Sequence, residues 1–393
     1  MFLKISKIFY VFFMFYIMWF QPVFFTINNA PLILGLGMIG FLLLHKLSIG
    51  EELSFLITRP IFLWIIFTVY AFSTGYFVAT NKILLINSII TYIQTIVMMI
   101  FIINLSKYEE SNKFFVNSYA TLAIIYALTL IFWGYDNKGI MTISMSSNPN
   151  SDGMTLLFGV FCILVSLDLK KLFRLTMSYI SVGLLLYAVI LTGSRKSFLA
   201  AVLLIMLWII LVFKEYLKFS SLKNKVALSF LIVVTVGFIV TKIGPLFYET
   251  ALFARLTEGN GYEGDLIRVA MYKSAMEYFY ENPFFGIGFN QFREFWGTYS
   301  HSTYAEIIST TGMIGTILYF TPYFVITHYL IRVYKMGRST IIASQAILYI
   351  ILMILMCSLA VGTIHFYGIR DSIMFALMIS FCCIEMVKFK GKK

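Results

Sequence analysis

One histidine lies where this sequence could perform proton transfer. His301, in YSHSTYAEIISTTGMIG, stands where a polar stretch enters a hydrophobic segment. A neutral imidazole with a pKa near its usual ~6.5 can accept a hydroxyl proton, which accelerates a reaction by about 10²–10⁴-fold. His301 is therefore the candidate general base, although a histidine hydrogen-bonded at the level of lipid headgroups fits the same position. His365, in IHFYGIRDS, is the rival base, whereas His45 and His328 lie in or near hydrophobic segments and are expected to be structural.

Two adjacent positive charges interrupt the hydrophobic sequence at TGSRKSF, residues 192–198. Charges at membrane depth cost about 2.5–3.5 kcal/mol on insertion scales, so they usually have a partner. A guanidinium grips phosphate oxygens bidentately, and hydrogen bonds to charged groups are worth about 1.5–3 kcal/mol each. We expect Arg195 to bind a lipid-linked diphosphate and Lys196 to be mainly structural. Ordinary contact with lipid headgroups is the alternative for both.

The longest polar interruption contains a segment with helical periodicity. Apolar residues fall on one predicted helix face at Ile267, Ala270, Met271, Ala275, Tyr278 and Phe279. Asp265 is the expected N-cap, and Asn282 with Pro283 ends the helix. Arg268 and Lys273 would leave by the polar side. Such a helix lies on the bundle or on the membrane surface, and its basic residues would then touch either substrate or headgroups.

Two further motifs favour turns. Gly286 and Gly288, in FFGIGFN, form a lone GxG that no strand precedes, so a tight turn folding the loop back over the bundle is more plausible than a phosphate site. Asn148 and Asn150, in SSNPNSDG, have the chemistry to bind sugar hydroxyls, but NPN and NSDG are ordinary turn and cap sequences.

The composition excludes a soluble protein. Hydrophobic residues make up 60% of 393 positions, charged residues make up 12%, and the mean hydropathy is +0.88. Hydrophobic stretches near or above the ~18 residues that cross a bilayer recur along the chain, which excludes β-barrel alternation and requires helices. We predict an all-α, polytopic membrane bundle of about twelve helices. The four cysteines lie in apolar segments without disulfide or metal-ligand spacing.

The predicted helices divide the chain into residues 1–243 (bundle helices 1–9), 244–302 (a long outer-face loop with the amphipathic helix) and 303–393 (helices 10–12 and a basic cytoplasmic tail). The predicted spans are Ile8–Ile27, Pro31–Leu44, Pro60–Val78, Ile83–Ile103, Phe114–Trp133, Met154–Leu167, Leu175–Leu191, Phe198–Phe213, Val226–Ile243, Tyr304–Leu330, Ile341–Val361 and Ile373–Val387.

Threading these spans alternately places most of the 30 Lys and Arg residues on one side, which the positive-inside rule makes cytoplasmic. Both termini are then cytoplasmic, and Arg195, Arg268 and His301 face outward. The net charge of +12 and the pI of about 9.3 are therefore largely a topology signal, and we expect no nucleic-acid partner.

The TGSR turn, the long outer loop with its arginine helix, NPFFGIGFNQF, and His301 leading into YAEIISTTGMIG together resemble the O-antigen ligase and polymerase family. The likeness in helix layout spans most of the chain, and its specific part is confined to Thr192–Phe198 and Arg268–Gly315. It implies a GT-C-like enzyme of the bacterial cytoplasmic (inner) membrane that needs no metal and no cofactor. Such an enzyme transfers a glycan from undecaprenyl diphosphate to an acceptor hydroxyl.

The resemblance also implies residue roles. His301 would be the base, while Arg195 and Arg268 would hold the diphosphate and offset leaving-group charge. The implied substrate-binding set is Arg195, Arg268, Arg293, Lys196, Glu306 and Tyr304. Glu306 resembles the family's acidic position, or is a helix-start carboxylate favoured by the macrodipole. The residue after the histidine is often Asn in this family but is Ser302 here, which leaves the orientation of His301 open.

We therefore expect a repeat-unit polymerase for O-antigen, capsule or exopolysaccharide. The first alternative is a ligase that transfers the finished glycan to lipid A core or another surface acceptor. An alternative of another class is a lipid-linked oligosaccharide flippase or transporter, which predicts charges along a path inside the helices, whereas the polar candidates cluster on one face. The expected partners are the undecaprenyl-diphosphate-linked glycan and membrane lipid, with a flippase and a chain-length regulator as further candidates.

Overall fold

The computed structural model describes residues 1–20, 30–109, 112–137, 139–145, 148–167, 172–210, 248, 250–257, 262–336, 340–362 and 368–390. Within these ranges nearly all secondary structure is helical. The exception is a short antiparallel hairpin of β1 (Tyr135–Asn137) and β2 (Ile140–Thr142), with Tyr135 opposite Thr142. The predicted all-α membrane bundle is confirmed.

Within the described residues, each predicted span overlaps a helix; Val226–Ile243 and the ends of Ile8–Ile27 and Phe198–Phe213 lie outside the described residues. The bundle helices are α1 (Phe2–Phe15) with the π-helical turn η1 (Tyr16–Phe20), α3 (Ala30–Ser48), α4 (Arg59–Val78), α5 (Lys82–Tyr108), α6 (Lys113–Trp133), α7 (Pro149–Ser166), α8 (Leu172–Leu191), α9 (Arg195–Trp208), α16 (Thr303–Met336), α17 (Thr340–Leu359) and α18 (Ile369–Lys390). Among the described residues, eight helices are long and apolar enough to cross a membrane.

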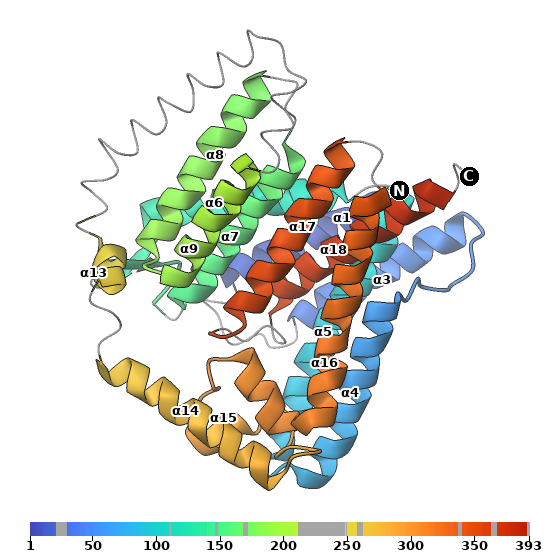
Figure 1. The fold of residues 1–393 in the computed structure, drawn as a ribbon. Coiled ribbons are helices and arrows are strands. Elements are labelled where there is room, and N and C mark those ends of the chain that lie inside the picture. Colours follow the sequence, from blue (N-terminus) through green and yellow to red (C-terminus); the bar gives the residue numbers. More distant parts are fainter. Residues whose placement is uncertain are drawn as a thin grey trace.

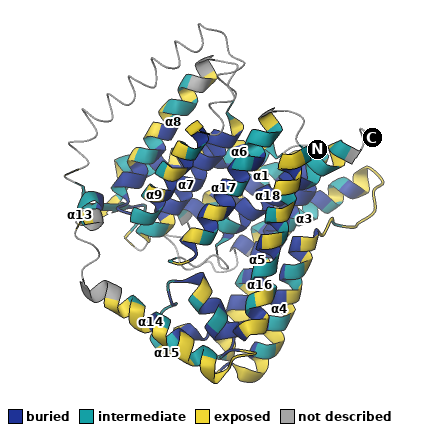
Figure 2. Cartoon of the chain, in the orientation of Figure 1, coloured by how far each residue is buried: buried dark blue, intermediate teal, exposed yellow. Residues whose placement is uncertain are grey.

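The bundle is held by close helix pairs: α5 packs on α18, α6 on α7, α1 on α3, and α16 on α4 and α17. Burial is greatest along α7 and along the inward sides of α17 and α18, whereas α4 and α8 expose more of their surface (Figure 2). At Gly159 the helices approach so closely that an added Cβ would lie 2.5 Å from the Cβ of Ala123. Small residues at such crossings let membrane helices gain van der Waals contact where water supplies no driving force.

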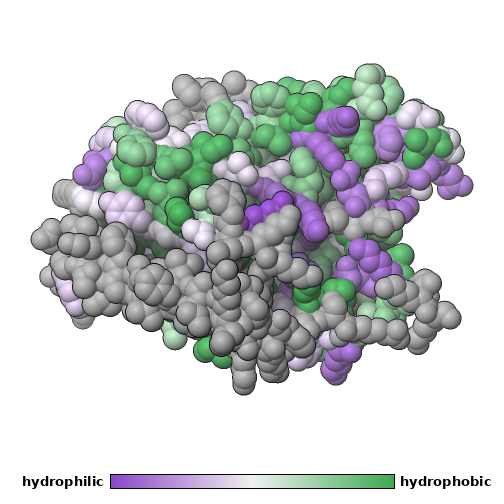
Figure 3. All heavy atoms as spheres, turned by 90° about the horizontal axis from the view of Figure 1, so that it is seen from above, coloured by the Kyte–Doolittle hydropathy of each residue, from purple (hydrophilic) through white to green (hydrophobic). Residues whose placement is uncertain are grey.

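A short helical segment lies across one end of the bundle. It comprises α13 (Ala251–Thr257), α14 (Tyr262–Glu281) and α15 (Phe292–Trp296). In Figure 1, α14 and α15 lie at the bottom, and α13 lies at the left beside the bundle. We call this side the α14 end. The start of α1 and the end of α18 lie at the opposite end (Figure 1). Figure 3 looks onto that opposite end, where hydrophilic side chains gather among hydrophobic ones on the described surface.

The end of α14 was predicted correctly from the sequence, whereas its start and part of its buried face were not. The helix ends at Glu281 before Asn282, as expected, but it begins at Tyr262, so Asp265 lies within it and is not the N-cap. Met271 and Ala275 are buried as predicted, and they form a small core with Phe292 of α15.

Two positions predicted for the buried face of α14, Ile267 and Ala270, are exposed instead. Arg268 does not leave by the polar side: it lies on the inward face, near enough to Lys196 and His301 to shift their pKa values. The physical reason is that α14 carries apolar residues on its exposed face as well, at Leu266, Val269, Met276 and Tyr280. Hydrophobic periodicity therefore did not single out one face.

A backbone break in α16 receives the glycine-rich loop at residues 283–288. Gly312 has φ 64° and ψ −168°, a conformation essentially restricted to glycine. The Gly288 amide donates to the carbonyl of Thr310 (2.9 Å), and a Cβ on Gly286 would lie 2.4 Å from the carbonyl carbon of the same residue. The tight turn predicted for FFGIG is confirmed, and it serves backbone packing against the bundle.

Candidate functional site

Three consecutive carbonyl groups just beyond α17 join three segments that are distant in sequence. They accept hydrogen bonds from the Thr303 amide (to Ala360, 2.8 Å), the Tyr272 hydroxyl (to Val361, 3.1 Å) and the Lys196 ammonium (to Gly362, 2.6 Å). The donors belong to the starts of α16 and α9 and to the middle of α14. Because the last carbonyls of a helix carry partial negative charge, they suit a cation. We call this set of contacts the α17 junction.

The 192–198 turn is fixed from its other side by the start of α7. The Ser194 hydroxyl donates to Asn150 Oδ1 (3.0 Å) and lies 3.0 Å from Ser197 Oγ. Gly153 allows this contact, since a Cβ there would lie 2.7 Å from Ser197 Oγ. Asn148 caps α7 through a hydrogen bond from the Asn150 amide (2.9 Å). The turn and cap role predicted for SSNPNSDG is confirmed, but sequence reasoning missed that this loop borders the site.

Three cations converge at the α17 junction. Burial, together with the nearby positive charges of Arg268 and Arg195, lowers the pKa of Lys196 to about 8. Like charges close together disfavour the charged form of each group, so this arrangement is electrostatically costly unless an anion lies among them. Guanidinium groups are suited to the oxygens of phosphate. The cluster of Arg195, Lys196 and Arg268 is therefore chemically matched to a multiply charged anion.

His301 lies beside this cation cluster with an unusual backbone. Its φ is 60°, the left-handed region that non-glycine residues rarely adopt and that costs about 1–3 kcal/mol. Burial lowers the pKa of its imidazole, and the positive charges of Arg268 and Lys196 lower it further. The ring is thus held in its neutral, proton-accepting form at pH 7. This is the protonation state that a general base needs.

The left-handed turn at His301 is held by the residues around it. The Ser300 amide donates to Glu306 Oε2 (2.7 Å), and the Ser300 hydroxyl donates to the Ser302 carbonyl (3.0 Å). Ser302, where the family often has Asn, is buried with its hydroxyl 3.5 Å from the Ala360 carbonyl, so it packs toward the α17 junction. Glu306 is fully buried beneath the turn, and its Oε1 has no hydrogen-bond partner among the described residues.

Tyr299 extends the site toward α15 and α7. Its ring lies 4.5 Å from the ring of His301, tilted by 55°. Burial raises the pKa of the Tyr299 hydroxyl, against the opposing effect of the Arg293 and Arg268 charges and of a side-chain hydrogen bond from Asn148. Arg293, on α15, is thereby placed at the edge of the site.

The comparisons with known proteins bear on this same region. Residues 180–320 match the O-antigen ligase family, and the matched stretch includes Arg195, Arg268 and His301. This part of the chain is therefore similar to the O-antigen ligase family. A search of the curated proteins gave no match. A solved structure described as "Structural coordination of polymerization and crosslinking by a peptidoglycan synthase complex" is similar with a TM-score of 0.46 and 10% identity, over 85% of this chain and 97% of that chain.

The fold brings most of the predicted site residues together. Arg195, Lys196, Arg268 and His301 meet at the α17 junction, and Arg293 lies beside Tyr299. Tyr304, in α16, has other partners: its hydroxyl donates to the Cys357 carbonyl (2.9 Å), and its ring stacks on that of Phe320 with 5.0 Å between the ring centroids. Glu306 lies behind the His301 turn.

Two of the other histidines, His45 and His328, have different neighbours. The ring of His45 packs against Tyr108 at 5.1 Å, and that of His328 lies 6.3 Å from Tyr329. The rival base His365 lies outside the described residues.

Three residues near the site were missed from sequence: Asn148, Tyr272 and Tyr299. For Tyr299 a signal existed, because it lies only two residues before His301. Tyr272 lies four residues after Arg268, and hence on the same helix face. Nothing in the sequence joined Asn148 to these residues, since that contact depends on the packing of α7.

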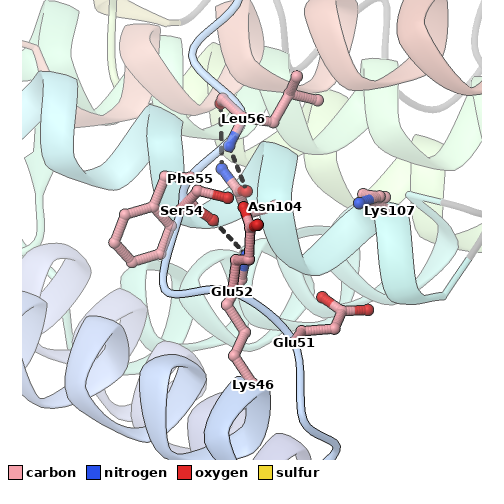
Figure 4. A pocket seen from close by; sticks show the side chains of 8 residues that line it. All are labelled: Lys46, Glu51, Glu52, Ser54, Phe55, Leu56, Asn104 and Lys107. Carbon is pink, nitrogen blue, oxygen red and sulfur yellow. Dashed lines mark hydrogen bonds between the residues drawn. The ribbon is translucent and has the colours of Figure 1, made fainter.

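A cavity of about 400 Å³ lies away from this site, at the opposite end of the bundle (Figure 4). It is lined by Lys46, Glu51, Glu52, Ser54, Phe55, Leu56, Asn104 and Lys107. Figure 4 shows that the side chain of Asn104 makes two hydrogen bonds to the backbone of Leu56: it donates to the carbonyl (3.1 Å) and accepts from the amide (2.8 Å). These contacts anchor the α3–α4 connection and include none of the predicted site residues.

Proposed function

We propose that this protein is a repeat-unit polymerase that transfers a glycan from undecaprenyl diphosphate to a hydroxyl of a lipid-linked acceptor unit. The reaction would take place on the outer face of the cytoplasmic membrane. One observation carries the proposal: three cations suited to a diphosphate converge beside a histidine that the site keeps neutral. The match to the O-antigen ligase family over residues 180–320 supports the same class of glycan transfer.

In the proposed reaction, Arg195, Lys196 and Arg268 bind the diphosphate of the donor. The acceptor oxygen bonds to the anomeric carbon of the donor sugar, the bond from that carbon to the phosphate oxygen breaks, and undecaprenyl diphosphate leaves. His301 takes the proton of the acceptor hydroxyl. The arginines offset the negative charge that grows on the leaving group, which stabilises the transition state more than the ground state.

The donor also tunes its own base in this scheme. In the free site, the Arg268 and Lys196 charges hold the imidazole pKa low. A bound diphosphate neutralises part of this positive field, so the pKa of His301 rises and its affinity for the acceptor proton increases. Proton transfer is thereby favoured only when the donor is in place.

The experiment is reconstitution of the purified protein in liposomes with lipid-linked repeat units. Wild-type protein should produce longer glycans on undecaprenyl diphosphate, and His301→Ala should lose activity by about 10²–10⁴-fold. His45→Ala, a histidine at the opposite end, is the matched control and should retain activity. Full activity of His301→Ala would refute the assigned base. Activity lost in a chelator and restored by a divalent cation would refute the metal-independent reaction.

A ligase is the second candidate, and the O-antigen ligase family match favours it. It would use the same donor contacts and differ in the acceptor, which would be lipid A core or another surface molecule. Offering both acceptors in the same liposomes separates the two: glycan on undecaprenyl diphosphate indicates a polymerase, and glycan on the other acceptor indicates a ligase. Movement of the lipid-linked unit across the bilayer without any glycan transfer would instead indicate a flippase.

A further inference from the structure

The side chain of Tyr299 occupies a position that the proposed reaction does not yet use. It belongs to the turn that presents His301, and the two residues flank Ser300, whose amide points inward to Glu306. The Tyr299 and His301 side chains lie on the same side of this turn. Their rings are in contact, 4.5 Å between centroids at an angle of 55°.

The His301 ring needs such a neighbour. The contacts that fix the turn act on its backbone: Ser300 is held by Glu306, and the Thr303 amide by the Ala360 carbonyl. They do not fix the side-chain torsions of the imidazole. Arg268 and Lys196 also face His301, and their positive charges disfavour the protonated ring.

Tyr299 is itself anchored from a distant part of the chain. Its hydroxyl accepts a hydrogen bond from the Asn148 side chain, at the start of α7. Asn148 is fixed because its Oδ1 accepts from the Asn150 amide at 2.9 Å, so its amide nitrogen remains to serve Tyr299. Asn150 in turn accepts from Ser194, next to Arg195. One chain of contacts thus runs from the donor-binding turn to the imidazole.

We infer that Tyr299, anchored by Asn148, is a positioning residue that orients the imidazole of His301 toward the acceptor hydroxyl. The inference rests on the proposed function, since it assigns a partner to the proposed base. The ring contact fixes the imidazole, and the hydrogen bond fixes the ring. A base misplaced by about 1 Å can lose about 10²-fold in rate, so a loose imidazole would lower kcat with little change in donor affinity.

The experiment compares Tyr299→Leu, which removes the ring, with Tyr299→Phe, which keeps the ring and removes the hydroxyl. In the reconstituted assay, Tyr299→Leu should lower kcat by about 10–10²-fold with little change in KM. Tyr299→Phe should restore most of the rate and remain about 2–10-fold below wild type, the value of one neutral hydrogen bond. Asn148→Ser, which keeps a helix cap but cannot reach Tyr299, should match Tyr299→Phe, and the double variant should be no slower than either single variant.

A second measurement does not depend on activity. In a chain whose other three histidines are replaced, the pH dependence of modification by diethyl pyrocarbonate reports the pKa of His301, because only the neutral ring reacts. Tyr299→Leu should admit water and move this pKa back toward 6.5, whereas Tyr299→Phe should leave it nearly unchanged.

Three outcomes decide the matter. If Tyr299→Leu keeps both kcat and the His301 pKa while His301→Ala is inactive, the positioning role is overturned and the proposed function stands. If only the acceptor KM rises, Tyr299 binds the acceptor and the positioning role is likewise overturned. If His301→Ala is fully active, it is the proposed base that fails, independently of Tyr299.

Discussion

The two ends of the bundle treat positive charge in opposite ways. At the end opposite α14, two lysines have partners that suit a cation: Lys7 Nζ lies 2.6 Å from Glu109 Oε1, and the buried Lys46 donates to the Ser54 carbonyl and lies over the Phe55 ring. At the α14 end, Arg268 and Arg195 instead lie close enough to Lys196 to lower its pKa. A bound anion would offset this repulsion between like charges.

This difference indicates which end evolved for binding. A cluster of like charges persists only where the fold enforces it, and here the α17 junction does so through hydrogen bonds to Lys196 and Tyr272. Perturbed titration beside an acid–base group is typical of functional sites. Variants that alter the cluster should therefore change activity, whereas variants that alter the matched charges should not.

The largest effect on this comparison is expected from Arg268→Ala. Arg268 contributes to the field at Lys196, His301 and Tyr299, and it would supply charged hydrogen bonds to the donor diphosphate. Losing one or two such bonds, each worth about 1.5–3 kcal/mol, should reduce kcat/KM by about 10–10⁴-fold. Arg268→Lys keeps the charge but cannot make a bidentate contact, so its kcat/KM should lie between those of wild type and Arg268→Ala.

The matched control for Arg268→Ala is Arg332→Ala, an exposed arginine near the end of α16 at the opposite end. Both variants remove one guanidinium from a helix, and only the first should reduce transfer in the reconstituted assay. Equal losses in the two variants would mean that the cation cluster has no special role.

A medium-sized effect is expected from pH. The Lys196 pKa is about 8, so raising the pH through this value removes one charge from the cluster and should raise the donor KM by several-fold. His301 has a lowered pKa, so base activity should persist as the pH falls to 6.5 and be lost only below it. Lys196→Arg keeps its charge at alkaline pH and should abolish the alkaline limb alone. A flat donor KM from pH 7 to 9.5 in wild type would contradict a role for Lys196 in donor binding.

Much of this contrast was accessible from the sequence. The helices could be predicted because a segment that crosses a bilayer must be long and apolar. Alternating the direction of successive spans then placed Arg195, Arg268 and His301 at one end of the bundle. The structure confirms the helical bundle and brings these three residues together.

What the sequence did not yield depends on packing. The inward rotation of Arg268 was missed because α14 is apolar on both faces, so only the contact of Met271 and Ala275 with Phe292 decides its orientation. The role of the carbonyls beyond α17 could not be predicted either, since every helix end has such backbone groups whatever its sequence. Their role appears only once Lys196 reaches Gly362.

A smaller effect, on stability, is expected from Glu306→Ala. The buried Glu306 Oε2 accepts from the Ser300 amide, so truncation leaves a buried N–H without its partner and should cost about 1–3 kcal/mol. Glu306→Gln keeps an acceptor in place and should cost less. Thermal unfolding in detergent measures both. If Glu306→Ala and Glu306→Gln unfolded at the same temperature as wild type, the carboxylate would not support the His301 turn.

The smallest effect should come from the matched charges at the opposite end. Lys7→Ala and Glu109→Ala each break a partly exposed ion pair. Exposed ion pairs typically contribute about 0.2–1 kcal/mol to the free energy of unfolding. The temperature of thermal unfolding should fall only slightly in either variant. The difference from wild type should be smaller at high salt, because dissolved ions already screen the ion pair in the wild-type protein. Glycan transfer should be unchanged, since neither residue lies near the α17 junction. A loss of transfer comparable to that of Arg268→Ala would mean that the two ends are coupled, and that charge matching does not separate structural from functional cations in this bundle.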